Sequence, residues 1–276
     1  MGRRKLFCER GPLCYAVSLR KEYLLRWCRD LGSHVRFASS QTGEPLPFIV
    51  KSHRSVLLRK LFGVNQQLQQ NKAVNLRLAS RGIDGLLIRP GETFSFWRRV
   101  GNPTEKRGFL EGLVIIGGGK PSAAVGGGLC QLANLIHWLV LQSPLTVTEL
   151  HHHTDAIFPD SDRRVPFGTG TSVFYNNVDY RFQNDTPDTY QLRVWLDETD
   201  LCGELLCSRE LPVRYRIEER DHHYQKESDG WYYRVSEIWK KTIDRASGGT
   251  LEETMIFKNH SRVLFDESLI PPEQIR

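Results

Sequence analysis

A run of three glycines that leads into one cysteine and then into an amphipathic segment is the feature that most constrains this fold. Residues 126–131 read GGGLCQ. The apolar positions that follow recur at the three- and four-residue spacing of one helical face. They are Leu132, Leu135, Ile136, Leu139 and Val140. Cys130 lies off this stripe, so the sequence predicts a helix whose first turn carries a thiol directed away from the core.

Cys130 is therefore a candidate nucleophile. Unpaired N–H groups and the positive end of the helix dipole favour an anion at a helix N-terminus, and so lower the pKa of a thiol. Gly127 and Gly128 would let a substrate carbonyl approach the backbone, where two N–H groups would receive an oxyanion. The alternative is a glycine turn followed by a structural cysteine, since free cysteine is among the most buried residue types.

A nucleophilic cysteine needs a base and a group that orients the base. Three consecutive histidines, at positions 151–153, follow a predicted strand that returns along the helix toward Cys130. We expect His153 to be the base, with His151 as the second candidate. Asp179 lies on a later predicted strand, where it would orient the imidazole or else serve as a turn carboxylate.

The same histidines raise the question of a metal site. Adjacent histidines on a strand point to opposite faces, and structural zinc normally draws on two spaced pairs of ligands. We therefore expect neither a metal nor another cofactor. The six cysteines do not suggest a disulfide framework, because the chain is neither small nor visibly secreted. Cys202 and Cys207 flank a predicted hairpin turn at Gly203-Glu204.

Four blocks in a fixed order carry a resemblance to a known family. They begin with RPGETFSFWRRVGNPTEKRGFLEG at 89–112, continue with GGGLCQLANLIHW and TELHHH, and end with GTGTSVFYNNVDYRFQND. Together they resemble the VanW family over roughly residues 70–190. Some VanW-domain proteins act as peptidoglycan L,D-transpeptidases that use a cysteine in the glycine-cysteine-glutamine block.

The resemblance implies roles for particular residues. Cys130 matches the family's cysteine, with Gly127 and Gly128 before it and Gln131 after it. The resemblance implies that the two glycines and the glutamine bind the substrate or its oxyanion. A Glu-x-x-x-His pattern of the family is occupied by Glu149 and His153.

The block that begins at Asp179 also matches the family. One departure is that Leu132, Ala133 and Asn134 stand where many members have Val-Ser-Thr. A hydroxyl at those positions therefore has no role in this chain.

The periodicities predict an α+β fold, in which an antiparallel sheet packs around the one buried helix that starts at the Gly-Gly-Gly-x-Cys turn. We expect three parts: a helical N-terminal region at 1–72, a core domain at 73–192, and a β-rich C-terminal extension at 193–276. Predicted strands include Thr93–Trp97, Leu113–Ile116 and two near residues 171–175 and 180–184.

Charge and hydropathy narrow the range of partners. The chain has 276 residues and a net charge of +6, but its basic residues alternate with acidic ones and no nucleic-acid-binding motif is present. We therefore expect no nucleic-acid partner, while peripheral contact with anionic surfaces stays open. No run of about 18 apolar residues and no secretory h-region occur, so we expect no transmembrane segment and a cytoplasmic location. Related transpeptidases, however, act outside the membrane.

Three hypotheses of function follow. The first is a cysteine acyltransferase linked to glycopeptide resistance or cell-wall metabolism, acting on peptidoglycan stem peptides or their precursors. The second is a module of the same fold that binds wall precursors or glycopeptide without turnover. The third is an accessory protein that acts through other resistance or wall enzymes, with a structural cysteine.

Overall fold

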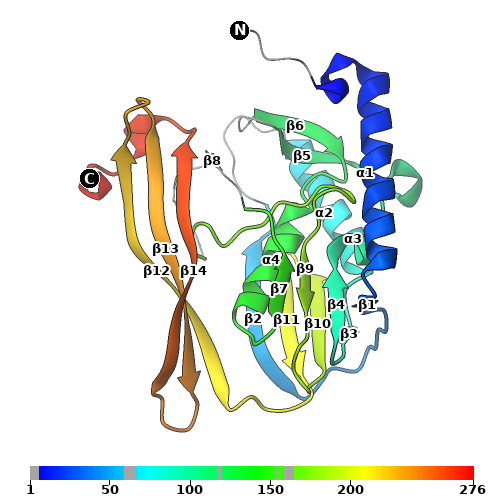
Figure 1. Cartoon of the computed structure of the whole chain (residues 1–276), viewed down its shortest axis with the longest axis vertical. Helices are drawn as coiled ribbons and strands as arrows, with labels where there is room; N and C mark the ends of the chain where they lie inside the picture. The colour runs from blue at the N-terminus through cyan, green and yellow to red at the C-terminus, as the bar shows by residue number, and fades with distance from the viewer. Residues whose placement is uncertain (1–5, 59–65, 117–119, 153–154, 158, 160–164) are drawn as a thin grey trace.

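The central element of the fold is α4 (Cys130–Leu141), a helix with eight of its twelve residues buried. It packs across β2 (Phe48–Val56) and β11 (Asp200–Cys207), which are neighbours in a sheet ordered β2-β11-β10-β3 (Figure 1). β10 spans Tyr190–Leu196 and β3 spans Leu86–Ile88. This computed structural model describes residues 6–58, 66–116, 120–152, 155–157, 159 and 165–276. It confirms the predicted α+β fold with a buried helix against antiparallel strands.

A glycine in the middle of β11 sets how closely α4 approaches the sheet. A Cβ added at Gly203 would lie 2.9 Å from Cδ2 of Leu135 and 3.1 Å from Cδ1 of Leu139. Glycine inside a strand costs stability, and it is typical of places where another element comes close. The two leucines therefore pack onto the backbone of β11, and Gly203 is where the helix makes this close contact.

A second sheet lies beside α4 and has the order β1-β4-β9-β7. Its strands are β1 (Arg36–Phe37), β4 (Glu92–Ser95), β9 (Arg181–Gln183) and β7 (Thr146–Glu149). The predicted strand Thr93–Trp97 ends early, because Ser95 caps a short helix, α3 (Phe96–Val100), by accepting a hydrogen bond from the N–H of Arg98.

The outer face of the core carries a helix and a hairpin. The helix is α2 (Gln66–Ser80), and the hairpin is formed by β5 (Glu111–Ile116) and β6 (Lys120–Val125). The expected strand at Leu113–Ile116 is confirmed as part of β5. Short 3-10 turns complete the chain at Phe7–Arg10, Glu105–Arg107, Glu267–Leu269 and Pro272–Gln274.

The C-terminal strands form a sheet of their own. β12 (Val213–Lys226), β13 (Tyr232–Asp244) and β14 (Thr250–Val263) pair antiparallel, and β8 (Asp155–Ala156) joins β14 in parallel. They make a long, twisted blade beside the core (Figure 1). The predicted boundary at 192/193 does not separate sheets, because β10 crosses it and β11 pairs with β2. The division between sheets falls after Cys207 and before Val213.

The N-terminal region is only partly helical. α1 (Pro12–Gly32) is a helix as expected, but residues 48–56 form β2, not part of a helix. The cause is tertiary: β2 supplies the antiparallel partner for the whole of β11, and such pairing overrides a weak local preference. For the same reason Gly203-Glu204 is not a hairpin turn. Cys202 and Cys207 are both free thiols on the continuous strand β11.

Residues 171–175, predicted as a strand, form no ladder and contribute only the isolated bridge of Phe174 with Val178. The N–H of Thr171 instead donates to the side chain of Asn134 at 2.6 Å, and the N–H of Ser172 donates to the carbonyl of His151 at 2.8 Å. This segment is thereby held between α4 and the chain that follows β7.

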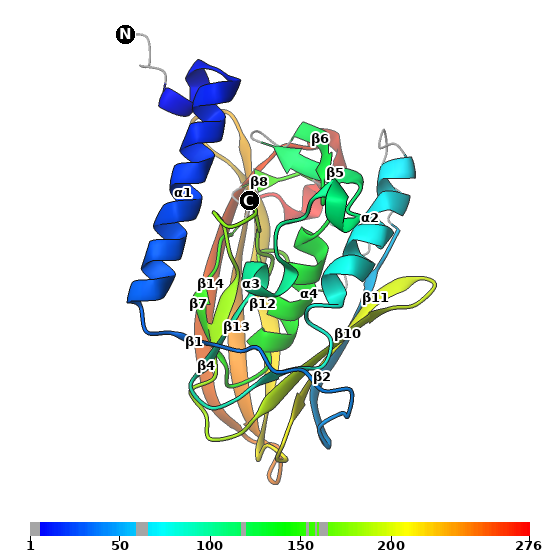
Figure 2. The same cartoon turned by 90° about the vertical axis from the view of Figure 1, so that its right-hand side faces the viewer.

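α1 lies along the outside of the molecule, on the side away from the β12–β14 sheet (Figures 1 and 2). None of its residues is buried. In the described part of the chain, no helix combines the length and apolar character needed to cross a bilayer.

The close contact at Gly203 leads to a prediction about stability. Gly203→Ala should lower the free energy of unfolding by about 1–3 kcal/mol, because the new methyl group forces Leu135 and Leu139 away from the sheet. Urea unfolding monitored by circular dichroism measures this change. Gly43→Ala is the matched control, since an added Cβ there meets nothing within 4 Å. Equal stability of the two variants would show that the helix does not need this close approach.

Candidate functional site

Cys130 is the first residue of α4, immediately after the glycine turn. Its Sγ lies 3.7 Å from the carbonyl oxygen of Val173, to which the thiol donates. The residue is half-buried, and it faces the segment 171–173 and not the α4–β11 interface. The prediction that the thiol occupies the first helical turn is confirmed.

The electrostatic expectation for this thiol is wrong in direction. Burial raises the pKa of the Cys130 thiol, and hydrogen bonding with the backbone of Val173 and of Cys130 itself lowers it only in part. A helix N-terminus stabilises an anion by at most about 2 kcal/mol, whereas removing an anion from water costs more. The thiol is therefore protonated at neutral pH.

The three glycines have a packing role. A Cβ on Gly127 would lie 2.1 Å from the carbonyl oxygen of Gly112, so the backbone of β5 occupies the space above this residue. Gly126 and Gly128 have φ of +79° and +93°, and added Cβ atoms would meet Pro103 at 2.6 Å and the aliphatic chain of Lys72 at 2.2 Å. The protein fills the space in which Gly127 and Gly128 were expected to admit a substrate carbonyl.

The N–H groups of two expected oxyanion donors, Gly127 and Gln131, are also engaged, as is that of the neighbouring Gly126. The N–H of Gly126 donates to the carbonyl of Leu110 at 3.0 Å, and that of Gly127 donates to Ala124 at 3.0 Å. The N–H of Gln131 donates to the carbonyl of Gly128 at 3.1 Å. An oxyanion beside the sulfur would have to use N–H groups between Gly128 and Cys130.

The side chain of Gln131 does not face a substrate site. Its amide nitrogen donates to Oγ of Ser55 at 3.0 Å and to the carbonyl of Val56 at 2.8 Å. Both acceptors belong to β2. Gln131 therefore ties the start of α4 to the edge of the sheet, and this explains why a glutamine follows the cysteine.

His151 has a carboxylate partner, but it is Glu149 and not Asp179. Nε2 of His151 lies 3.1 Å from Oε1 of Glu149. Arg26 of α1 donates two hydrogen bonds to the same carboxylate, at 2.5 and 2.7 Å, and the N–H of Asp179 donates to it at 3.1 Å. Burial alone would raise the pKa of Glu149, but the hydrogen bonds from Arg26 and His151 lower it below its usual value. His153, the preferred base, lies outside the described residues.

Asp179 is a buried structural carboxylate. It accepts hydrogen bonds from Oγ of Ser95 at 2.6 Å, from the N–H groups of Trp97 at 3.1 Å and Tyr180 at 2.9 Å, and from Nε of Arg181 at 2.7 Å. None of these partners is a histidine. The expected orienting of His153 involves a residue outside the described ones; within them, Asp179 fixes the start of α3 and the position of Arg181.

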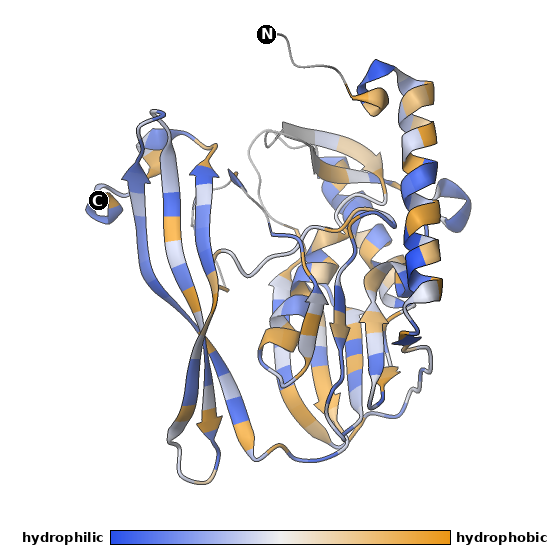
Figure 3. Ribbon diagram, in the orientation of Figure 1, coloured by the Kyte–Doolittle hydropathy of each residue, from blue (hydrophilic) through white to orange (hydrophobic). Residues whose placement is uncertain are grey.

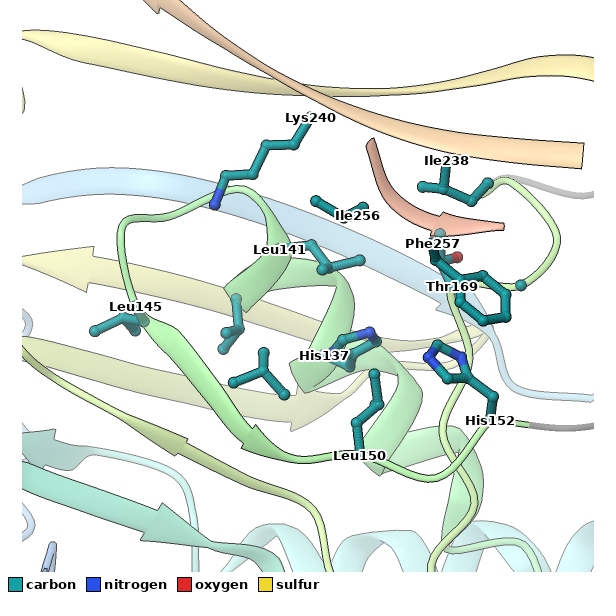
Figure 4. Close-up of a pocket in the computed structure, with 13 residues that line it drawn as sticks. His137, Leu141, Leu145, Leu150, His152, Thr169, Ile238, Lys240, Ile256 and Phe257 are labelled. Atoms are coloured by element: carbon teal, nitrogen blue, oxygen red, sulfur yellow. The ribbon is translucent and has the colours of Figure 1, made fainter. Parts of the chain in front are cut away.

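The other two described histidines of this region line a different space. A cavity of about 220 Å³ lies between α4 and the β13–β14 strands, lined mainly by apolar side chains together with His137, His152 and Lys240 (Figure 4). Burial lowers the pKa of His137 to about 3, and it lowers that of Lys240 to about 8. Cys130 is not in the lining, so this cavity is separate from the space around the thiol.

No group of three or more histidine, cysteine, aspartate or glutamate side chains in the described ranges is arranged to hold a metal ion. The acidic cluster at Glu149 and Asp179 is neutralised by arginines. Arg181 donates to Asp30 at 2.7 Å as well as to Asp179, while Arg26 binds Glu149. The chemistry available here is that of a thiol, an imidazole and backbone N–H groups.

Comparison with known proteins agrees with the four sequence blocks. The family model described as "VanW like protein" matches residues 71–206, which include α4 and end within β11. The chain is 29% identical over 229 residues to the Vancomycin B-type resistance protein VanW of Enterococcus faecalis (strain ATCC 700802 / V583), covering 83% of this chain and 82% of that protein. This chain belongs to the VanW family.

A second relative shares a smaller part. The "Uncharacterized protein YoaR" of Bacillus subtilis (strain 168) is 31% identical over 115 residues, which make up 42% of this chain and 36% of that protein. No solved structure matches the chain significantly. The family model therefore covers α4 and the strands around it except β1 and β2, and it leaves α1 and strands β12–β14 outside.

Two residues that position this VanW site were not predicted. Asn75 of α2 is fully buried and donates to the carbonyls of Leu110 and Gly127, while its Oδ1 accepts from the N–H of Leu110. Arg26 holds Glu149 from α1. An asparagine among the apolar positions of a helix was the available signal for Asn75. Nothing in the sequence indicated that α1 would lie against Glu149.

The ion pairs at Glu149 give a prediction with a defined pH dependence. Glu149→Gln should lower the free energy of unfolding by about 1–3 kcal/mol at pH 7, because Arg26 and Arg181 lose a half-buried anion. The folded-state pKa of Glu149 lies below the unfolded value of about 4.3, so its stabilisation is fully present above that pH. It is lost as the pH falls through the folded pKa.

Urea unfolding at pH 7 and at acidic pH measures this dependence. The gap between wild type and variant should be constant above about pH 5 and should narrow on acidification. Glu198→Gln, at an exposed position, is the control. A gap that does not change with pH would contradict the assigned role of the Glu149 carboxylate.

Proposed function

We propose that this VanW-family chain is a cysteine-dependent acyltransferase of the peptidoglycan L,D-transpeptidase type that acts in glycopeptide resistance or cell-wall metabolism. Its substrates would be peptidoglycan stem peptides or their precursors. The family membership and the similarity to the vancomycin B-type resistance protein of Enterococcus support the biological context. The arrangement around Cys130 supports the chemistry.

The observation that carries the proposal is the convergence of Cys130 and His151 on one segment. Residues 171–173 contact the thiol through the carbonyl of Val173 and hold the backbone of His151 through the N–H of Ser172. A nucleophile on a helix N-terminus and a histidine backed by a carboxylate thus flank the same three residues. Cysteine acyl transfer requires a base within hydrogen-bond reach of the nucleophile, and the shared segment supports pairing the thiol with a histidine of this region.

Because the resting thiol is protonated, the reaction begins with proton removal by a base. The histidine accepts the proton of Cys130 while Sγ attacks the carbonyl carbon of a stem-peptide amide. A carbon–sulfur bond forms, and backbone N–H groups between Gly128 and Cys130 stabilise the oxyanion. The carbon–nitrogen bond then breaks, and the histidine passes its proton to the leaving amine.

In the second half-reaction an acceptor amine attacks the thioester. A new carbon–nitrogen bond forms, the carbon–sulfur bond breaks, and the proton lost by the amine returns through the histidine to the sulfur. The enzyme is regenerated with no net change in protons or electrons. In this scheme Glu149 orients the imidazole of His151, the part first assigned to Asp179.

Two histidines remain candidates for the base. His153 has the family position, and His151 has the carboxylate partner at 3.1 Å. Either His151 or His153 would carry out the proton transfer. His152 is excluded because its ring stacks on Phe257 with centroids 3.8 Å apart, facing the β14 side.

The test is formation of a covalent acyl-enzyme. Wild-type protein incubated with a synthetic stem tetrapeptide should gain the mass of one acyl group at Cys130, detected by intact-protein and peptide mass spectrometry. Cys130→Ala should abolish the adduct, while Cys28→Ala, which removes an exposed thiol on α1, should retain it. His151→Ala and His153→Ala should separate the two candidates, since loss of the base slows acylation about 10²–10⁴-fold.

A second function is favoured by the raised pKa of Cys130 and the engaged N–H groups, namely a module that binds wall precursors without turnover. It predicts stoichiometric binding of the tetrapeptide that survives Cys130→Ala, with no adduct on the wild-type protein. Isothermal titration calorimetry of both proteins distinguishes the two. Binding without acylation would overturn the acyltransferase proposal.

A further inference from the structure

We propose that α1 binds to the surface of an anionic membrane through the face that it turns away from the core. This proposal does not depend on the chemistry of Cys130. It rests on how α1 is attached, on which of its side chains are exposed, and on where the net charge of the chain is located.

α1 is held to the core along one face only. Tyr23 makes an edge-to-face contact with Tyr175, with ring centroids 5.2 Å apart. Arg26 binds Glu149 and Asp30 binds Arg181 through charged hydrogen bonds. Residues 23, 26 and 30 are spaced three and four apart, so they mark a single face of the helix. α1 lies at the edge of the molecule (Figure 2), and none of its residues is buried.

An apolar stripe runs along the exposed surface of α1, about 100° around the helix from this attached face. Hydrophobic bands recur along α1 (Figure 3). The large apolar residues of the stripe are each 51% to 78% exposed. They are Leu13, Val17, Leu24, Trp27 and Leu31. Single exposed apolar residues are normal on a protein surface, but a continuous stripe of this kind marks an interaction site.

The charges nearest the stripe are mainly basic. Arg20 lies within it, and Lys21 lies at its border with its Nζ 3.7 Å from Oε1 of Glu22; Asp30 lies on the attached face. Residues 1–32 contain eight basic and three acidic residues, so they hold +5 of the net charge of +6. The positive charge of the chain is thus concentrated in the part that includes the exposed stripe. An amphipathic helix of this kind is complementary to anionic lipid headgroups.

A second copy of the chain is a poorer binding partner for the stripe than a membrane surface. Positions 13, 17, 20, 24, 27 and 31 alternate by four and three, as in a coiled-coil seam, but the third of them is Arg20. A parallel pair would bring two guanidinium groups together in the middle of the seam. At a membrane surface the same side chain extends to a lipid phosphate while its aliphatic part stays among the leucines. Trp27 suits the headgroup boundary for a similar reason.

The experiment is co-sedimentation of the full chain with lipid vesicles. The protein should bind vesicles of phosphatidylglycerol and phosphatidylcholine in equal parts, and it should bind phosphatidylcholine vesicles at least about tenfold more weakly. Added salt should weaken the binding to the anionic vesicles, since exposed charges are screened. Equal binding to both vesicles, or binding to neither, would overturn the proposal.

Two sets of variants separate the stripe from general adhesion. The Leu13→Gln/Leu24→Gln double variant should weaken binding at least about tenfold, because two leucines no longer enter the lipid. Arg20→Gln/Lys21→Gln should reduce the preference for anionic vesicles. The control is Leu251→Gln/Met255→Gln, which changes exposed apolar residues of β14 and should bind as the wild type does.

Sedimentation velocity without lipid tests whether the stripe instead binds a second copy of the chain. A dimer of the wild-type protein that Leu13→Gln/Leu24→Gln dissociates would assign the stripe to a second copy and refute the membrane proposal. Circular dichroism of each variant checks that α1 remains helical. Since every substituted side chain is exposed, folding of the core should be unaffected.

Discussion

The close packing of α4 between β2, β11 and the glycine turn is the constraint on which the rest of the molecule depends. The helix can lie on the sheet only because Gly203 leaves room for two leucines, and its first turn can lie against β5 only because Gly112 and Gly127 both lack a Cβ. These contacts hold α4 against the sheet at Gly203 and hold the turn before it against β5. They fix where Cys130 begins the helix, and therefore which segment its thiol faces.

At that position two electrostatic effects oppose one another. The helix N-terminus favours a thiolate by about 0.3–2 kcal/mol, whereas burial of an anion shifts a pKa by up to about 3–5 units. For Cys130 burial is the larger effect and the thiol keeps its proton. The proposed acyl transfer would consequently depend on a base and not on a preformed thiolate, which would make the neighbouring histidines as important as the cysteine.

A network of charges joins the site to the outside of the molecule. Glu149 receives Arg26 from α1 on one side and His151 on the other, while Asp30 of the same helix binds Arg181. Because charged side chains make this attachment, the apolar side chains of α1 are left facing outward. The Glu149 carboxylate contacts both Arg26 of α1 and the imidazole of His151. A shift of α1 at a membrane would therefore also move the carboxylate that orients this imidazole.

The sequence by itself determined the elements whose signal is local. The period of the apolar residues predicted α4, and local patterns predicted the helical region that holds α1 and the β-rich extension that holds β12–β14, because such patterns reflect which face each element buries. The four blocks identified the VanW family. Only the tertiary structure decided what depends on residues distant in the chain: that residues 48–56 pair with β11, that Asp179 binds Ser95 and Arg181, and that Glu149 is the partner of His151. Strand pairing and desolvation arise between distant segments, and no local pattern encodes them.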